Sequence, residues 1–496
     1  MLKNIKKLSN KTLIYPIVAF FGIVYLLRMF LNHPWYDELY TYYSFISKGP
    51  IYAAIHWPLP NNHMGYSALA ACFGIFGQAT IALRGVSFIA ATLNIYLIYK
   101  LSEKLVEKYS LIPPVLYGTM FLVHNISVQG RGYTLATTCY LVALLSMYMI
   151  CSEEKAKRRY YILFAGALSF SAYILASSAF FIVPVCLTGG LYLLINKKYK
   201  TLLRLVMAGV VAGLIAMFLY SVVWLAIGSN LLSKTDGSGF TGVYQISIIK
   251  EAPIKALSTG IEYMLATPYI QSIERSEVIS GMFGYLSTLF GQYYSGLGEA
   301  IVIFLLVVLV LSIVCVIKKK ESFLEMFLLV SIVMLPVMLI IQSQQPYYRV
   351  FSYFGVVVAL SFSKMLNQLK IPKSIAYIIA LLLLVLLFTP DYMAPMASRE
   401  NDIYEASELL AANKEPLGEG DTILYADDYQ KYVFKFYYDL DLEEKPMGEA
   451  KYIFLPKDLN GVWPMLFDEN NFDFDSLNNC YEEVAATAQY TVYSLK

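Results

Sequence analysis

Two adjacent carboxylates, Asp37 and Glu38, are the strongest candidates for chemistry in this sequence. They follow an apolar segment, residues 12–31, that reaches the length of about 20 residues needed to cross a bilayer core. Charge is costly at the end of a membrane span, so such groups indicate a function. A carboxylate can remove the proton of an attacking hydroxyl or amine. We predict that Asp37 and Glu38 are catalytic; pairing with Arg28 or Arg84 is the structural alternative.

Three arginines stand at the starts of later apolar segments. Arg84 opens the second segment, Arg131 lies in Gln129-Gly-Arg-Gly-Tyr133, and Arg349 precedes a late segment. The planar guanidinium group matches phosphate oxygens, whereas arginines at helix ends also extend to lipid head groups. The glycines beside Arg131 allow a close backbone approach. We predict that these arginines bind a donor phosphate, and that the substrate pocket includes Tyr36, His63, Tyr133 and Tyr348.

Three of the four histidines, His33, His56 and His63, fall in one predicted loop. Together with Asp37 or Glu38 they could hold zinc with an open position, as in a membrane hydrolase. Their spacing matches no motif of the HExxH type. We therefore predict no metal site, and the zinc hydrolase remains an alternative.

The composition is that of a polytopic membrane protein. Hydrophobic residues make up 58% of the 496 residues and charged residues only 15%. Residues 391–496 carry 8 basic and 22 acidic side chains, so the rest of the chain is basic. The basic residues form short clusters between apolar segments, which argues against nucleic-acid binding. No nucleotide-binding motif occurs, so we expect no cofactor, and a synthetic enzyme would need an activated, lipid-linked donor.

Eleven apolar segments predict about eleven membrane helices. Basic clusters occur in every second connection, which places the N-terminus in the cytoplasm and the C-terminal tail outside. The first segment is read as an uncleaved anchor. The outer connections include long loops at 32–79 and 229–299, and residues 64–77 form an apolar helix too short to span. The segments are 12–31, 79–99, 111–128, 131–151, 160–175, 178–195, 202–228, 300–317, 322–341, 350–366 and 373–389.

Hydropathy falls abruptly at Asp391. We therefore divide the chain into a transmembrane domain, 1–390, and an extracytoplasmic α/β domain, 391–496. Helical apolar spacing predicts helices over 403–413 and 430–438, and short apolar runs predict strands at 422–425 and 452–455. The fold class is a polytopic α-helical membrane protein with a small α/β C-terminal domain.

The pattern resembles the GT-C superfamily of membrane glycosyltransferases, in the branch of protein O-mannosyltransferases and aminoarabinose transferases. The resemblance rests on Tyr36-Asp37-Glu38, Asn61-Asn-His-Met-Gly-Tyr66, Gln129-Gly-Arg-Gly-Tyr133, Tyr347-Tyr-Arg349 and the small outer domain. It departs from relatives at Gln129, where many have an acid, and at Met64-Gly-Tyr66, where many have Pro-Pro-Leu after the histidine. The resemblance implies Asp37 as base, Glu38 as an acceptor or architectural contact, and Arg131 and Arg349 on the donor phosphate.

We therefore expect a cell-membrane glycosyltransferase of the hexosyl or pentosyl type. It would take a sugar from a polyprenyl phosphate at the extracytoplasmic face and transfer it, with inversion, to a glycan, lipid or protein acceptor. A lipid-linked sugar transporter that does no chemistry is the second alternative, although no inverted repeat is visible in the sequence.

Overall fold

The computed structural model describes residues 10–56, 62–227, 273–318, 322–393, 399–426, 428–458 and 472–496. These residues form two compact units. The first comprises Met1–Met29 and Lys48–Ala394, and the second comprises Phe30–Ser47 and Pro395–Lys496.

Eight helical segments of the described residues are long and apolar enough to cross a membrane. They confirm a helical membrane protein, because each has the length and apolar composition needed to cross a bilayer core. They are α2 (Asn10–Leu31), α6 (Ala79–Leu105), α9 (Tyr133–Ser152), η4 with α11 (Ala176–Ser178 and Ala179–Ile195), α12 (Tyr199–Ile227), α17 (Gly298–Ile317), α18 (Phe323–Gln342), and η6 with α19 (Tyr348–Phe354 and Gly355–Gln368).

The other three predicted spans are shorter helices. Residues 111–128 form α7 (Ile112–Thr119) and α8 (Phe121–Ile126), because Met120 between them has an extended backbone. The remaining two are α10 (Arg158–Ile174) and α20 (Lys373–Leu386), of 17 and 14 residues. The count of eleven spans stays a prediction.

The short apolar helix expected at 64–77 is present as α5 (Met64–Cys72) followed by η2 (Phe73–Phe76). Of the predicted loop 229–299, residues 229–272 lie outside the described residues. Its remainder contains α15 (Arg275–Ser280) and α16 (Met282–Gly291). Short helices elsewhere in the first unit are α4 (Pro50–Ile55), η3 (Glu107–Tyr109) and α21 (Pro390–Met393).

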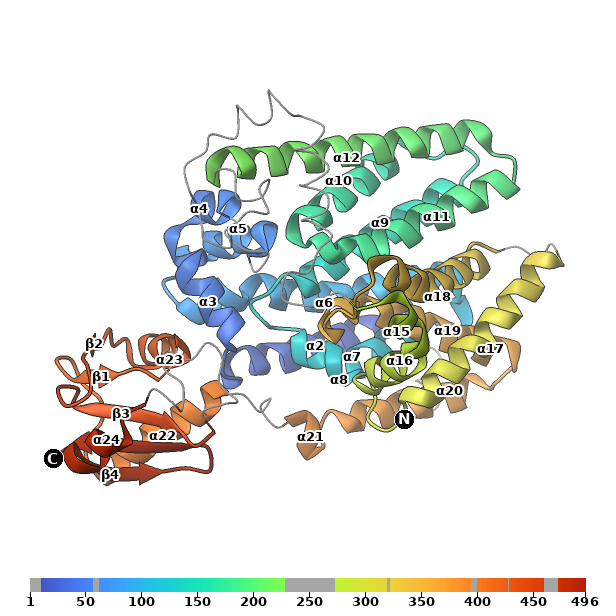
Figure 1. Cartoon of the computed structure of the whole chain (residues 1–496). Helices are drawn as coiled ribbons and strands as arrows, with labels where there is room; N and C mark the ends of the chain where they lie inside the picture. Colours follow the sequence, from blue (N-terminus) through green and yellow to red (C-terminus); the bar gives the residue numbers. More distant parts are fainter. Residues whose placement is uncertain are drawn as a thin grey trace. The chain divides into compact units, whose positions relative to one another are not determined.

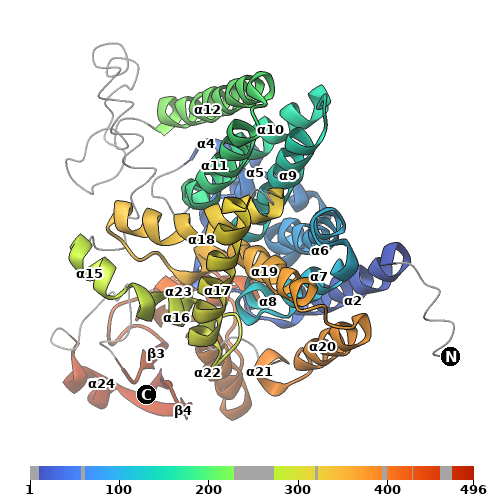
Figure 2. The same cartoon turned by 90° about the vertical axis from the view of Figure 1, so that its right-hand side faces the viewer.

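The helices of the first unit pack both on sequence neighbours and on helices distant in the chain. Helix α9 packs against α6 and α10, α10 packs against α12, and α11 packs against α18. Figure 1 shows α9 to α12 side by side, and Figure 2 shows the group of α17, α18 and α19 from a second direction. A buried ion pair between Lys364 on α19 and Glu325 on α18 also contacts Ser312 on α17, so the three helices share one charged connection.

The second unit contains a five-stranded sheet in the order β2-β1-β3-β5-β4. Strand β1 pairs in parallel with β2 and β3, whereas β5 pairs antiparallel with β3 and β4. The predicted helices and strands of the tail are confirmed by this fold. Its elements are α22 (Arg399–Asn413), β1 (Thr422–Leu424), α23 (Asp428–Tyr438), β2 (Glu443–Glu444), β3 (Tyr452–Pro456), α24 (Phe474–Cys480), β4 (Tyr481–Ala486) and β5 (Tyr490–Leu495).

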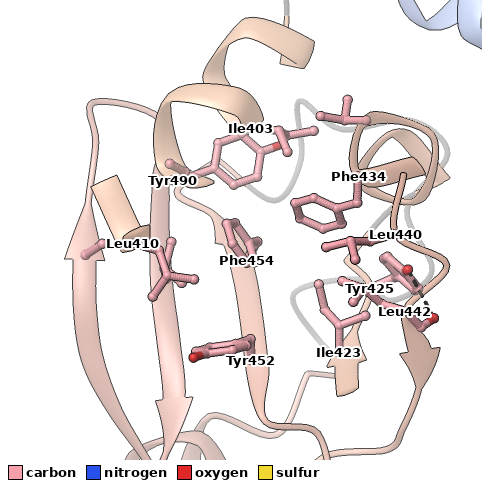
Figure 3. Close-up of a cluster of buried hydrophobic side chains, with 14 of the residues drawn as sticks. Ile403, Leu410, Ile423, Tyr425, Phe434, Leu440, Leu442, Tyr452, Phe454 and Tyr490 are labelled. Carbon is pink, nitrogen blue, oxygen red and sulfur yellow. Dashed lines mark hydrogen bonds between the residues drawn. The ribbon is translucent and has the colours of Figure 1, made fainter. Parts of the chain in front are cut away.

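The core of this unit lies between the sheet and helices α22 and α23. Figure 3 shows Ile403 of α22, Phe434 of α23 and Phe454 of β3 turned toward one another, and all three are buried. Apolar side chains on one face of each helix are thereby removed from water, which is the main source of stability for such a domain.

Helix α3 (Tyr36–Ser44), which carries the candidate carboxylates, belongs to the second unit together with η1 (Ile46–Lys48) up to Ser47. Its apolar positions Tyr36, Leu39, Tyr40 and Tyr43 follow the spacing of one helical face. Leu39 is completely buried and belongs to the same core cluster as Ile403 and Phe434. Helix α3 also packs against α23. The acidic helix is therefore built into the core of the C-terminal fold.

The substitution Leu39→Ala should destabilise the second unit. Removing a buried leucine side chain leaves a cavity and costs about 2–5 kcal/mol. Faster protease cleavage within residues 395–496 would report the loss. Leu39→Met is the matched control, because a swap of similar volume costs less than about 1.5 kcal/mol. Equal protease resistance of Leu39→Ala and wild type would contradict the placement of Leu39 in the core.

Candidate functional site

The two carboxylates of α3 have different environments. The Glu38 side chain is 1% exposed, and its Oε2 accepts a hydrogen bond of 2.9 Å from the backbone N–H of Trp35. This bond satisfies a backbone donor at the start of the helix, as a glutamate in the first turn commonly does. Asp37 is partly exposed. Of the pair, Glu38 has a defined architectural contact and Asp37 is the more accessible acid.

Aromatic rings surround the helix that carries these acids. The Tyr36 ring lies 4.1 Å from the Tyr429 ring, and the Tyr43 ring is stacked on Tyr432 at 5.6 Å, both measured between centroids. Such pairs contribute about 0.5–1.5 kcal/mol each beyond the area they bury. Tyr36, assigned to the substrate pocket from the sequence, therefore contacts α23 within the second unit.

In the first unit, His63 joins the turn that contains Arg131. The backbone N–H of Gly132 donates a 2.7 Å hydrogen bond to Nδ1 of His63, and Nη2 of Arg131 lies 3.2 Å from Nε2 of the same ring. The Tyr133 ring stands edge-on to His63 at 5.1 Å. His63 and Arg131 are 3% and 4% exposed. The structure thus brings together three residues that the sequence assigned separately to phosphate binding and to the pocket.

Arg349 lies over the face of the Tyr133 ring, and so it is close to His63 and Arg131 as well. Its guanidinium carbon lies 5.7 Å from the centroid of the Tyr133 ring and 4.9 Å from that of Tyr347. Aromatic faces attract a cation at these distances. Two guanidinium groups, Arg131 and Arg349, therefore lie around His63 and Tyr133.

Glycines and small polar groups fix the turn that carries Arg131. A Cβ atom at Gly132 would clash with Ile174 at 2.5 Å and would lie in tight contact with the Nδ1 atom of His63 at 3.2 Å. Ser87 of α6 lies with its Oγ 2.5 Å from the carbonyl oxygen of Gln129. The Tyr66 hydroxyl donates to the Leu83 carbonyl oxygen at 2.5 Å. These contacts join α5, α6 and the turn into one frame.

The environment of His63 favours its neutral form. Burial lowers the pKa of His63 well below its ordinary value of 6.5, and the charges of Arg131 and Arg349 lower it further. The unfolded chain takes up a proton below about pH 6.5 that the folded chain does not. This histidine therefore lowers the stability of the fold as the pH falls through that value, and it stays uncharged near neutral pH.

Arg84 and Arg28 make contacts with the body of the bundle. Arg84 is buried and donates through Nη1 to the carbonyl oxygen of Met29 at 3.1 Å. Arg28 donates to the Tyr392 carbonyl oxygen and to Oδ1 of Asn125, both at 2.9 Å. These bonds hold helix ends together, and the phosphate-binding role predicted for Arg84 stays a prediction.

The two tyrosines before Arg349 have different neighbours. The ring of Tyr348, assigned to the pocket, lies 5.4 Å from the Tyr285 ring, whereas the guanidinium group of Arg349 lies over the ring of Tyr347.

The sequence did not predict the roles of Ser87 and Tyr66. Their signal is weak in the sequence, because one hydroxyl on an apolar helix is common and its partner lies in a distant segment.

The histidines considered for zinc have separate environments. His33 contacts the hydroxyl of Tyr437 through Nδ1 at 2.5 Å, and His56 is stacked on Tyr52 at 4.4 Å. Nδ1 of His63 accepts the Gly132 N–H bond. Within the part of the chain that the structure describes, no three His, Cys, Asp or Glu side chains are grouped to hold a metal ion.

Comparison with known proteins relates this chain to enzymes that transfer sugars. Residues 63–225 match the family model of dolichyl-phosphate-mannose-protein mannosyltransferases. The segment contains His63, Arg84, Arg131 and Tyr133. A search of curated protein sequences gave no match.

Two solved structures align with most of this chain, and the first of them shows a similar fold. The oligosaccharyltransferase of Archaeoglobus fulgidus aligns with a TM-score of 0.52 and 13% identity over 88% of this chain and 67% of its own. ArnT from Cupriavidus metallidurans, bound to undecaprenyl phosphate, aligns with a TM-score of 0.43 and 12% identity over 98% of both chains.

These findings confirm the resemblance drawn from the sequence and support glycosyl transfer; they give no support to the transporter or the zinc hydrolase. The multi-pass membrane character is confirmed by the apolar helices. The chain is a membrane protein with the fold of GT-C glycosyltransferases, and its residues 63–225 match the dolichyl-phosphate-mannose-protein mannosyltransferase family.

Proposed function

We propose that this protein transfers a hexosyl or pentosyl group from a polyprenyl phosphate to a glycan, lipid or protein acceptor, with inversion. One observation carries the proposal: Arg131 and Arg349 lie around the buried His63 and Tyr133, in and beside the segment that matches the mannosyltransferase family. Paired guanidinium groups suit a phosphate. The family model itself names a dolichyl-phosphate-linked donor.

In the proposed mechanism, the acceptor hydroxyl attacks the anomeric carbon while Asp37 accepts its proton. A new carbon–oxygen bond forms as the bond between the anomeric carbon and the phosphate oxygen breaks. The electron pair of the broken bond leaves with the polyprenyl phosphate, whose charge Arg131 and Arg349 stabilise. Preorganised charge stabilisation of this kind often contributes more to catalysis than any other single effect. A single displacement inverts the configuration of the sugar.

We place the reaction at the extracytoplasmic face. The basic clusters in every second connection support this orientation, because cytoplasmic loops are enriched in lysine and arginine. The N-terminus then lies in the cytoplasm, and residues 391–496 form an extracytoplasmic domain. We assign Glu38 an architectural role, since its carboxylate bonds the backbone of Trp35.

The substitution Asp37→Asn should lower sugar transfer by about 10²–10⁴-fold, because an amide cannot accept the proton of the acceptor. The assay uses purified protein in liposomes with a radiolabelled polyprenyl-phosphate sugar, and it measures release of polyprenyl phosphate. Glu38→Gln is the matched control: its amide oxygen can still accept the Trp35 N–H bond, so its loss should be far smaller. Normal turnover by Asp37→Asn would refute the assignment of the base, and absence of turnover in the wild type with every donor would refute the transferase.

The substitution Arg131→Ala should weaken binding of polyprenyl phosphate by about 10- to 100-fold, because charged hydrogen bonds to the phosphate are lost. Arg131→Lys keeps the charge but not the planar guanidinium group. Its affinity for polyprenyl phosphate should lie between those of wild type and Arg131→Ala. Arg158→Ala, at an exposed site at the start of α10, is the control with unchanged affinity. Affinity equal to wild type in Arg131→Ala would remove Arg131 from the phosphate site.

A further inference from the structure

His63 is placed between two hydrogen-bond donors. The backbone N–H of Gly132 lies 2.7 Å from Nδ1, and Nη2 of Arg131 lies 3.2 Å from Nε2. A backbone amide and a guanidinium group can donate but cannot accept through these nitrogens. A neutral imidazole has one acceptor nitrogen, so it can accept only one of the two bonds.

The geometry selects Nδ1 as the acceptor. The Gly132 amide is held by the backbone of a tight turn, in which the Arg131 N–H donates to the Gln129 carbonyl oxygen at 2.7 Å. The distance from Gly132 to Nδ1 is also the shorter of the two. Nδ1 therefore keeps its lone pair, and the proton of the neutral ring is on Nε2. The Nε2–H group and the guanidinium of Arg131 are then two donors side by side.

The doubly protonated ring does not fit this site. An Nδ1–H group would point at the Gly132 N–H, and the ring would carry its charge in a buried position beside Arg131 and Arg349. These contacts hold the pKa of His63 well below its ordinary value. The groups that face His63 are thus two cations, one backbone amide and the edge of Tyr133.

We propose that His63, held as the Nε2–H tautomer by Gly132, is a neutral donor that binds the phosphate of the polyprenyl substrate together with Arg131. This assignment rests on the function proposed above and names a further binding residue for it. An anionic oxygen at about 2.7–3.0 Å from both Nε2 and Nη2 would accept from both donors. Bonds from donors to charged oxygens are stronger than bonds between neutral groups.

This role differs from acid catalysis. His63 keeps its proton throughout the reaction, and its bond strengthens as negative charge builds on the leaving phosphate oxygens. Sugar transfer should therefore show no dependence on a histidine pKa between about pH 5.5 and 8, the range in which an ordinary histidine titrates.

Two substitutions separate the binding role from a structural one. His63→Asn places an amide oxygen near the position of Nδ1, so it keeps an acceptor for the Gly132 N–H and loses the Nε2–H donor. His63→Gln places an amide nitrogen near the position of Nε2, so it keeps a donor toward the phosphate. Binding of undecaprenyl phosphate to the full-length protein in nanodiscs should fall by about tenfold or more in His63→Asn and by less in His63→Gln. Equal affinity of His63→Asn and wild type would overturn the proposal.

Two other ligands test whether the phosphate group is what His63 contacts. Neutral undecaprenol should bind His63→Asn and wild type equally, and inorganic phosphate alone should bind His63→Asn more weakly than wild type. If His63→Asn lost affinity for undecaprenol as much as for undecaprenyl phosphate, His63 would only shape the lipid site, and the proposal would fail.

The tautomer can be observed directly. The chain has four histidines, so ¹⁵N-labelled histidine gives a simple spectrum, and His63→Asn identifies the signals of His63. We expect a protonated Nε2 and an unprotonated Nδ1 that do not titrate in the range of an ordinary histidine, with a shift of Nε2 when undecaprenyl phosphate binds. An Nδ1–H tautomer or an imidazolium would overturn the proposal.

The outcome for Arg131→Ala distinguishes the two proposals. If undecaprenyl phosphate binding falls in Arg131→Ala but not in His63→Asn, the donor site stands and the role of His63 is refuted. If neither variant loses affinity, the phosphate site itself is refuted, and the role of His63 with it.

Discussion

The hydrogen bond from the Gly132 N–H to Nδ1 of His63 connects segments 69 residues apart in the chain. It joins the start of α5 to the turn before α9. The absence of a side chain at Gly132 leaves room for this packing, because a Cβ atom there would clash with Ile174 at 2.5 Å and lie 3.2 Å from the histidine. The position of Arg131 depends on this turn. The same bond sets the proton of the histidine on Nε2, so one backbone amide determines both the placement of a cation and the donor beside it.

The arginines of the first unit show two ways in which a membrane protein stabilises buried positive charge. Arg28 and Arg84 are buried and donate to carbonyl oxygens, which offsets the loss of water. Arg349 stands over two aromatic rings. Rings attract a cation without using its donors in strong bonds. Arginines that all lie near the ends of apolar segments thus have different surroundings in the fold.

The acidic helix depends on the C-terminal fold. Leu39 of α3 and Phe434 of α23 are in one buried cluster, although nearly four hundred residues separate them. The core of this unit is incomplete until both ends of the chain are present. Asp37 lies two positions from Leu39, so packing in this core fixes the helix from which it projects. The C-terminal domain therefore has a structural task near the candidate base, whatever it also binds.

Elements with a local signal follow from the amino-acid sequence alone. Apolar runs of about 20 residues specify helices α2, α6 and α9 without reference to the rest of the chain, because lipid imposes length and hydropathy on every span. Apolar spacing likewise predicted α22, α23, β1 and β3, and short length identified α5. The candidate acids and arginines were also visible, because charge beside apolar segments is rare.

Which of these residues meet depends on the complete fold. It joined α3 to the tail, His63 to Gly132, and Arg349 to Tyr347 instead of Tyr348. It also broke the segment 111–128 at Met120. Hydrogen bonds and packing contacts between distant segments depend on the whole fold, and neither composition nor local spacing carries that information. The protonation of His63 is the clearest case, because it follows from a partner that no local pattern specifies.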